Sequence, residues 1–349
     1  MGKCLVTKLQ GSVNNSDLLK IGEMPIYVEK SNDAQASQYK LVVKTLKDSK
    51  AEIIGDGYFT DEGMVTNKGK IISIPANTST TLYFSNGNYE ARISNKYDIG
   101  MFILTEDGSA RNNFLSINLD DLKYSDNLTS LSLSNSKSYG DIKNLQGKDN
   151  IIIVYLSGTN VTGDAKSINI NKLTTLYIKS DNISYDISNL AGTTKLSAVN
   201  FADTSLQTGD LSNLSGNKNL QYIGILGKGL SGNLSVMSNF RSLAQNILRN
   251  FSDKITGDIG KLPDNITYFS NEIKVREFTY SKGSRTKILA VSKVKLSNVD
   301  TFLNDMADLS APSNNSYKLI TLVGTRTSAS DAAVQTLQSK GYTVSITPA

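Results

Sequence analysis

The residues best placed to do chemistry in this sequence are the acidic members of a recurring Gly-Asp pair. An Asp or Asn returns at this position every 22 to 25 residues, at Asp141, Asp164, Asp186, Asp210, Asn233 and Asp258. Gly precedes every one of them except Asp186, which follows Tyr185. Regularly spaced carboxylates suggest calcium, but calcium-binding solenoids carry denser Gly and Asp, as in nonapeptide repeats. Asp and Asn also cap short helical turns, and Gly permits a tight corner before them. We therefore predict that the six residues are structural caps, with no metal bound.

Other common catalytic groups are missing from the chain. Its 349 residues include no His and no Trp, and Cys4 is the only cysteine. This composition excludes a Ser-His-Asp triad, a His-ligated zinc site and an intrachain disulfide. The net charge of +5 is too small to argue for nucleic-acid binding. We expect no catalytic residue and no cofactor, and we expect that the protein is not an enzyme.

The sequence predicts no membrane insertion. No stretch of 18 apolar residues occurs, and the opening "MGKCLVTKLQG" has no apolar core of a secretory signal. We expect synthesis in the cytoplasm without export.

A second periodicity predicts the elements that must position the caps. An apolar residue opens a similar unit every 22 to 24 residues, at Leu128, Ile151, Leu173, Leu196, Leu220, Leu243 and Ile266. Most units follow the pattern L-x-x-L-x-L, as in "LTSLSL" and "LTTLYI", although "LAQNIL" departs from it. This period and code are typical of leucine-rich repeats. We predict a solenoid over residues 116–285, with one parallel strand per unit and short helical turns.

Different patterns flank the repeats. Residues 1–115 contain short β-branched or aromatic runs separated by turn residues, which predicts a separate antiparallel β-domain. Residues 286–349 include strand, helix and strand signals, which predicts a βαβ-like cap on the open end of the solenoid. The predicted fold class is mixed and β-rich.

The residues beside the second Leu of each unit should point outward from the concave sheet. We predict a binding face there, formed by Ile153, Tyr155, Tyr177, Lys179, Tyr222 and Tyr268. Tyr is common at recognition surfaces, but a ladder of tyrosines packed across strands fits the pattern equally well. A basic patch is a second candidate, formed by Lys274, Arg276, Lys282, Arg285 and Lys287. An ordinary solvated face is the alternative for that patch.

Several stretches together resemble leucine-rich-repeat proteins of tailed phages that infect gut Bacteroidetes, the crAss-like phages among them. They are "MGKCLVTKLQGSV", "EIIGDGYFTDEG", the "TGD" and "SNL" repeats, and "RTSASDAAVQTLQSKGYTVSIT". The resemblance implies a head-fibre or decoration protein on the virion surface, anchored to capsid proteins by residues 1–115. It also implies a homo-oligomer, dimer or trimer, formed through that N-terminal domain.

The expected function is therefore a non-enzymatic virion protein that displays its repeats, with a host-surface glycan or protein as a possible partner. The alternative is a bacterial cell-surface adhesin, which should carry an export signal. A carboxylate-based glycan hydrolase ranks last, because it would need acidic residues that converge on the concave face.

Overall fold

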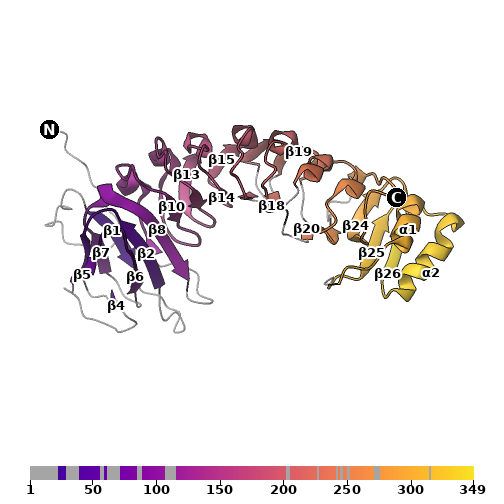
Figure 1. Ribbon diagram of the computed structural model, residues 1–349, viewed down its shortest axis with the longest axis horizontal. Helices are drawn as coiled ribbons and strands as arrows, with labels where there is room; N and C mark the ends of the chain where they lie inside the picture. Colours follow the sequence, from indigo (N-terminus) through magenta and orange to yellow (C-terminus); the bar gives the residue numbers. More distant parts are fainter. Residues whose placement is uncertain are drawn as a thin grey trace.

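The computed structural model forms an arc, with β-sheets at the N-terminal end, a solenoid in the middle and two helices at the C-terminal end (Figure 1). It describes residues 23–28, 39–55, 59–60, 71–84, 89–106, 115–201, 205–225, 228–240, 243, 247–249, 252–270, 276–313 and 316–349.

The N-terminal end contains antiparallel strands in two sheets, as the sequence predicts. The first sheet has the order β5 (Ile71–Ile74), β3 (Ser49–Gly55), β7 (Tyr89–Ile93), β1 (Met24–Val28) and β9 (Leu115–Ser116). The second runs from β8 (Ile99–Glu106) through β2 (Tyr39–Thr45) and β6 (Ser79–Phe84) to β4 (Phe59–Thr60). Apolar side chains such as Met24, Ile26, Leu41 and Phe102 are fully buried.

The second N-terminal sheet continues directly into the solenoid. Strand β8 pairs antiparallel with β2 on one side and parallel with β10 (Ser130–Ser132) on the other. The predicted domain boundary at residue 115 therefore crosses a continuous sheet. Because β8 supplies hydrogen bonds to both parts, the N-terminal end and the repeats share one sheet.

The inner side of the arc carries the strands predicted from the L-x-x-L-x-L pattern (Figure 1). After β10 come β12 (Ile153–Tyr155), β14 (Thr175–Ile178), β16 (Ala198–Phe201) and β18 (Tyr222–Ile225), all parallel and in register. Their central apolar residues, including Leu131, Val154 and Leu176, are buried. We call the solvent side of β10, β12, β14, β16 and β18 the concave face.

The predicted inner sheet is divided in two. Within the described residues, one sheet ends at β18, and β20 (Ile247–Arg249) begins another that continues through β22 (Tyr268–Ser270). The division falls at the sixth unit, whose sequence "LAQNIL" departs from the repeat pattern. The residues of the predicted binding face therefore do not lie on one continuous sheet, because Tyr268 is on β22 and the others are on or beside β12, β14 and β18.

Each repeat also contains a second strand that the sequence did not predict. These strands form a parallel sheet along the outer side of the arc: β11 (Tyr139–Asp141), β13 (Asn160–Asp164), β15 (Ile183–Asp186), β17 (Gln207–Asp210), β19 (Gly229–Asn233) and β21 (Lys254–Thr256). The register is staggered, so that Gly209 pairs with Leu230 and Gly232 with Ile255. The expectation of one strand per unit is therefore wrong, because the Gly-Asp segment itself is extended.

Short 3-10 helices turn the chain at the outer edge. One, η1 (Lys96–Asp98), precedes β8, and η2 (Leu119–Leu122) follows β9. The others follow the outer strands: η3 (Ile142–Leu145), η4 (Ala165–Ser167), η5 (Ile187–Leu190), η6 (Leu211–Leu214), η7 (Leu234–Asn239) and η8 (Ile259–Lys261). In η2, η3, η5 and η6 the first and last residues are buried, so each turn also closes the core.

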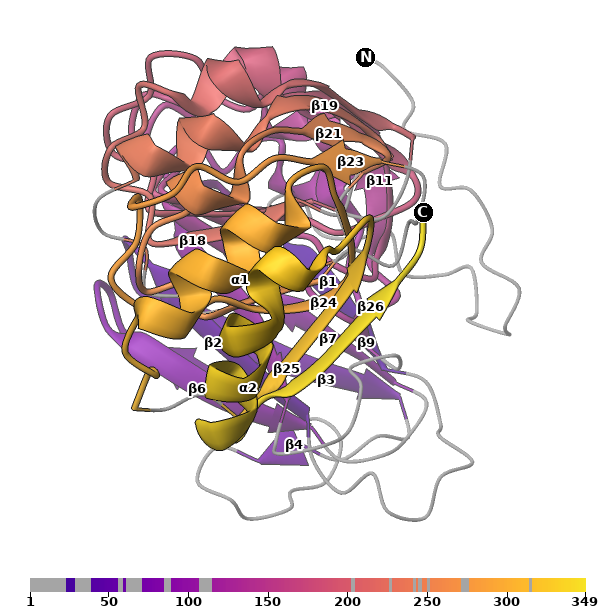
Figure 2. The same cartoon turned by 90° about the vertical axis from the view of Figure 1, so that its right-hand side faces the viewer.

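The C-terminal end alternates strands and helices. The elements are β23 (Glu277–Phe278), β24 (Ala290–Leu296), α1 (Val299–Asp308), β25 (Leu319–Val323), η9 (Ser328–Ser330), α2 (Asp331–Ser339) and β26 (Thr343–Thr347). Strands β24, β25 and β26 are parallel, with α1 and α2 on one side of them (Figure 2). Phe302, Leu303, Met306 and Leu337 bury the helices against this sheet.

Candidate binding surface

The recurring Asp and Asn side chains all lie at the start of a 3-10 turn. In each case the side-chain oxygen accepts a hydrogen bond from the backbone N–H two residues later, at 2.8 to 3.0 Å. Asn118 makes the same contact at 3.0 Å, before η2. Sequence reasoning missed Asn118 because Ile117 replaces the Gly, although its distance of 23 residues from Asp141 was a usable signal.

Two of these carboxylates have altered acidity for a local reason. The backbone N–H of Lys143 lowers the pKa of Asp141, and hydrogen bonds from the side chain and backbone of Ser212 lower the pKa of Asp210. A lowered pKa keeps the carboxylate ionised at neutral pH, which suits an acceptor and not a proton donor. Across the parts of the chain that the structure describes, no three His, Cys, Asp or Glu side chains come together as metal ligands.

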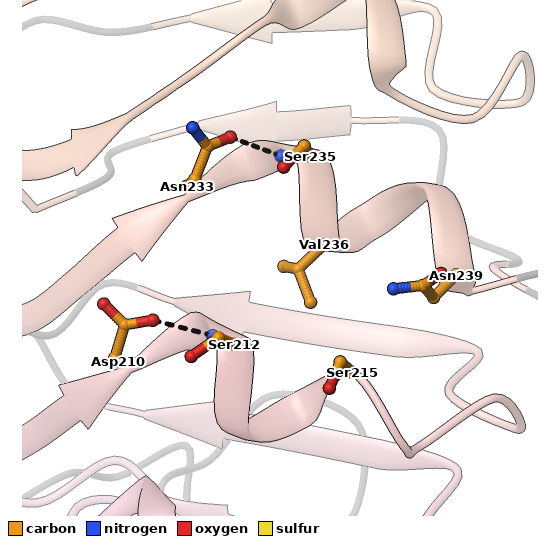
Figure 3. Close-up of a pocket in the computed structure, with 7 residues that line it drawn as sticks. All are labelled: Asp210, Ser212, Ser215, Asn233, Ser235, Val236 and Asn239. Carbon is orange, nitrogen blue, oxygen red and sulfur yellow. Dashed lines mark hydrogen bonds between the residues drawn. The ribbon is translucent and has the colours of Figure 1, made fainter.

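A shallow hollow lies between the turns η6 and η7 (Figure 3). Its lining consists of Asp210, Ser212, Ser215, Asn233, Ser235, Val236 and Asn239. Asp210 and Asn233 direct their oxygens to the backbone N–H groups of Ser212 and Ser235. The hollow is therefore the gap between two successive capped turns, and its one carboxylate is already engaged.

The concave face brings three of the predicted tyrosines into contact. The ring centroids of Tyr155 and Tyr177 are 4.6 Å apart with an edge-on geometry, and those of Tyr177 and Tyr222 are 5.8 Å apart. Tyr177 lies opposite Asn200, and Tyr222 lies opposite Ala198, on the strand between them. Because Ala198 carries only a methyl group, the rings of Tyr177 and Tyr222 can meet across β16. We call Tyr155, Tyr177 and Tyr222 the tyrosine cluster.

The tyrosine cluster is partly open to solvent. Tyr222 is 39% exposed, while Tyr155 and Tyr177 are half-buried. Burial, with a smaller contribution from Tyr155 and Tyr222, raises the pKa of Tyr177 to about 12. Its hydroxyl is therefore protonated at neutral pH and can donate a hydrogen bond to a ligand.

The rest of the concave face is uncharged. Its positions that alternate with the buried residues are Ser130, Ser132, Ile153, Tyr155, Thr175, Tyr177, Ala198, Asn200, Tyr222 and Gly224. Ile153 is half-buried in the row of Ser130 and Thr175, and Lys179 is exposed just beyond the end of β14. Lys179 therefore borders this face without forming part of it.

Tyr268 does not belong to the predicted binding face. It is only 8% exposed and lies on β22, in a different sheet from the tyrosine cluster. Its ring stacks on that of Tyr317 at a centroid distance of 4.0 Å. Packing between repeats and the C-terminal segment explains this tyrosine, and its assignment as a binding residue is wrong.

The predicted basic patch is also wrong as a single surface. The guanidinium of Arg285 is buried and donates to the backbone oxygens of Leu262 at 2.7 Å and Ile266 at 2.6 Å. Arg285 therefore satisfies carbonyl groups of the preceding repeat. Lys282 and Lys287 are exposed, Arg276 is half-buried, and Lys274 lies outside the described residues.

An exposed aromatic pair was not predicted. Tyr97 and Tyr124 are 41% and 46% exposed, and their ring centroids lie 5.6 Å apart. The Nζ atom of Lys123 lies 4.7 Å from the ring centroid of Tyr124. Both tyrosines precede strands and stand outside the L-x-x-L-x-L positions, so the repeat pattern could not identify them.

No protein-family model matches the chain, and no curated protein matches it. Three solved structures are similar in part. An internalin of Listeria monocytogenes is 18% identical with a TM-score of 0.38, over 67% of this chain and 68% of the internalin. The Arabidopsis receptor kinase HAESA is 18% identical with a TM-score of 0.34, and the ectodomain of the Arabidopsis thaliana receptor kinase GASSHO1/SCHENGEN3 is 14% identical with a TM-score of 0.28.

Both plant comparisons cover 62% of this chain, which spans only 44% of the HAESA chain and 33% of the GASSHO1/SCHENGEN3 chain. At these identities and TM-scores, the assignment of a leucine-rich-repeat solenoid rests on the spacing and register of this chain's own parallel strands. Among the described residues, no helix is both long and apolar enough to cross a membrane.

Proposed function

We propose that this protein is a non-enzymatic binding protein that contacts its ligand through the tyrosine cluster. The observation that carries the proposal is the contact of three partly exposed tyrosines on an otherwise uncharged face. Tyr combines a large apolar ring with a hydroxyl that can form hydrogen bonds, which suits recognition of sugars or proteins.

The dimensions of the face favour an extended ligand. Five strands at a spacing of about 4.8 Å span about 20 Å, which is the scale of several sugar units or a protein segment. The face lacks the acidic pair that glycosidic hydrolysis requires, and the carboxylates of the outer turns are occupied by backbone N–H groups. These features support binding over catalysis.

We also propose that the protein is a virion component, held on the particle by its N-terminal end, with the repeats displayed outward. The sequence resemblance at the two ends of the chain supports this role, and the arc separates the N-terminal sheets from the C-terminal helices (Figure 1). Mass spectrometry of purified virions should detect the protein among the structural components. Its absence from virions, together with its presence on bacterial cells, would favour a cell-surface adhesin.

The tyrosine cluster can be tested with the variant Tyr155→Ser/Tyr177→Ser/Tyr222→Ser. Loss of one aromatic anchor at an interface typically costs about 2 kcal/mol, or roughly 30-fold in affinity. The triple variant should therefore adsorb to host cells, or to their purified capsular glycans, at least that much more weakly than the unchanged protein.

Tyr97→Ser/Tyr124→Ser is the matched control, because it removes another exposed tyrosine pair at a different place on the surface. This control should adsorb like the unchanged protein. Equal adsorption by the triple variant would mean that the tyrosine cluster is cross-strand packing alone.

A further inference from the structure

The C-terminal strand β26 is the outermost strand of its sheet. Within the described residues the sheet path ends at β26, which pairs only with β25 (Figure 2). All five residues of β26 pair in an unbroken parallel register. The opposite edge of β26 therefore presents a straight row of backbone groups.

Two hydrogen bonds to the neighbouring chain segments establish which backbone groups of β26 face that free edge. The N–H of Thr343 donates to the Lys318 oxygen, and the Thr347 oxygen accepts from the Gly324 N–H, both at 2.9 Å. Since backbone direction alternates along a strand, the backbone groups of Ser345 also face β25. The N–H and C=O groups of Val344 and Ile346 consequently point away from the sheet.

The usual protection of a sheet edge is missing from β26. Edge strands are commonly blunted by charged residues, Pro, bulges or short length. The five paired residues of β26 are Thr-Val-Ser-Ile-Thr, with no charge, no Pro and no register shift, and Pro348 follows directly after the last of them. By contrast, β21 at the edge of the outer sheet has only three residues and carries an exposed Lys254.

The sequence of β26 is also nearly symmetric about Ser345. A twofold pairing of two copies requires that each residue meets the residue related to it by the axis. With the axis at Ser345, Thr343 faces Thr347, Val344 faces Ile346, and Ser345 faces itself. We propose that two copies of this chain associate through β26, in an antiparallel strand pair centred on Ser345.

This pairing gives each outward-facing backbone N–H and C=O group of Val344 and Ile346 a hydrogen-bond partner. The outward N–H and C=O groups of Val344 and Ile346 would form two hydrogen-bonded residue pairs, and Ser345 would lie in a close pair with Cα atoms about 4.5 Å apart. Thr and Ser side chains form favourable cross-strand pairs at such positions. A charged or asymmetric partner strand would lose this match, which is why a second copy is the occupant.

The side-chain directions show what such a dimer would display. Val344 and Ile346 are partly buried against the core beneath α1 and α2, whereas Thr343, Ser345 and Thr347 are exposed on the opposite face. Antiparallel pairing about an axis normal to the sheet keeps equivalent faces on the same side. The exposed faces of β26 in the two copies would thus lie on the same side of the dimer, with α1 and α2 of both copies on the other.

The full chain carrying Ser345→Asp or Ser345→Lys tests the pairing, with molar mass measured by light scattering during size-exclusion chromatography. The unchanged chain should have twice the monomer mass. Each variant alone should be a monomer, because like charges would lie directly opposite each other. An equimolar mixture of the two variants should recover the dimer mass through the opposite charges.

Gln335→Asp is the matched control, since Gln335 is exposed on α2 and outside the strand. It should remain a dimer, and unchanged melting temperatures should show that all variants fold. A monomeric unchanged chain would overturn the proposal. A dimer that persists in Ser345→Asp, or a mixture that stays monomeric, would overturn it equally, because the contact would then lie elsewhere.

Discussion

At the residue scale, two features of the structure require Gly at the first position of the Gly-Asp pair. Gly140, Gly163, Gly209, Gly232 and Gly257 have φ angles between +105° and +127°. Each also lies against the cap of the preceding repeat. A Cβ atom on Gly209 would come 2.7 Å from the Oδ1 atom of Asp186, and one on Gly163 would come 2.6 Å from that of Asp141. The pair therefore links neighbouring repeats as well as turning the chain.

Gly209→Ala should destabilise the protein more than Gly192→Ala. Both residues have positive φ, but a Cβ on Gly192 meets nothing within 4 Å. Gly192→Ala should cost about 1–2 kcal/mol for the backbone conformation alone. Gly209→Ala should add about 1 kcal/mol, because it displaces the Asp186 cap.

Thermal unfolding of the two variants, followed by circular dichroism, measures the difference. Equal melting temperatures would show that the contact with Asp186 contributes nothing beyond the local backbone conformation.

The sequence identified the caps at the Gly-Asp positions, because spacing and residue type together determine an N-cap, but it missed Asn118, which no Gly precedes. It could not identify which side chains are buried by contacts between repeats. The sequence alone predicts that Arg285 is exposed, but its guanidinium donates hydrogen bonds to backbone carbonyl groups of the preceding repeat. Tyr268 has the same place in the repeat as Tyr222, yet Tyr317 from a later segment covers it. Both errors concern partners distant in the sequence.

At the scale of the elements, periodicity predicted the inner strands but not the outer ones. The inner strands carry apolar residues at fixed positions, and this pattern is visible in the sequence alone. The outer strands contain segments such as Gln-Thr-Gly-Asp at β17, which have weak intrinsic β preference. They are extended because the neighbouring repeats supply their hydrogen bonds, so a repeat read by itself gives no signal for them.

The division of the inner sheet follows a change in the sequence. In the sixth unit, Asn246 occupies the second Leu position of the L-x-x-L-x-L pattern, where the other units have Leu, Val, Ile or Phe. The outer sheet nevertheless continues through β19 and β21. The two sheets of the solenoid therefore tolerate irregular repeats to different degrees, and the outer sheet keeps the arc continuous across this position.

At the scale of the whole molecule, the N-terminal sheets and the solenoid depend on each other. Residues beyond 115, including Ile117, Leu119, Leu122 and Leu131, are fully buried. Strand β10 covers the edge of β8. A fragment that ends at residue 115 loses all of this burial and exposes the edge of an eight-residue strand.

A fragment of residues 1–147 should therefore melt several degrees above a fragment of residues 1–115, and it should aggregate less. The longer fragment retains β10, β11 and η3, so it keeps the first repeat that stacks on β8. Repeats gain their stability from neighbours, and one retained repeat should be enough to protect the shared sheet. Thermal melting and size-exclusion chromatography of the two fragments measure both effects.

Equal melting temperatures would support an independent domain that ends at residue 115, and the pairing of β8 with β10 would then add little to stability. If the longer fragment is the stable one, it is also the correct fragment for testing attachment to particles, since failure of the shorter one to bind would report misfolding.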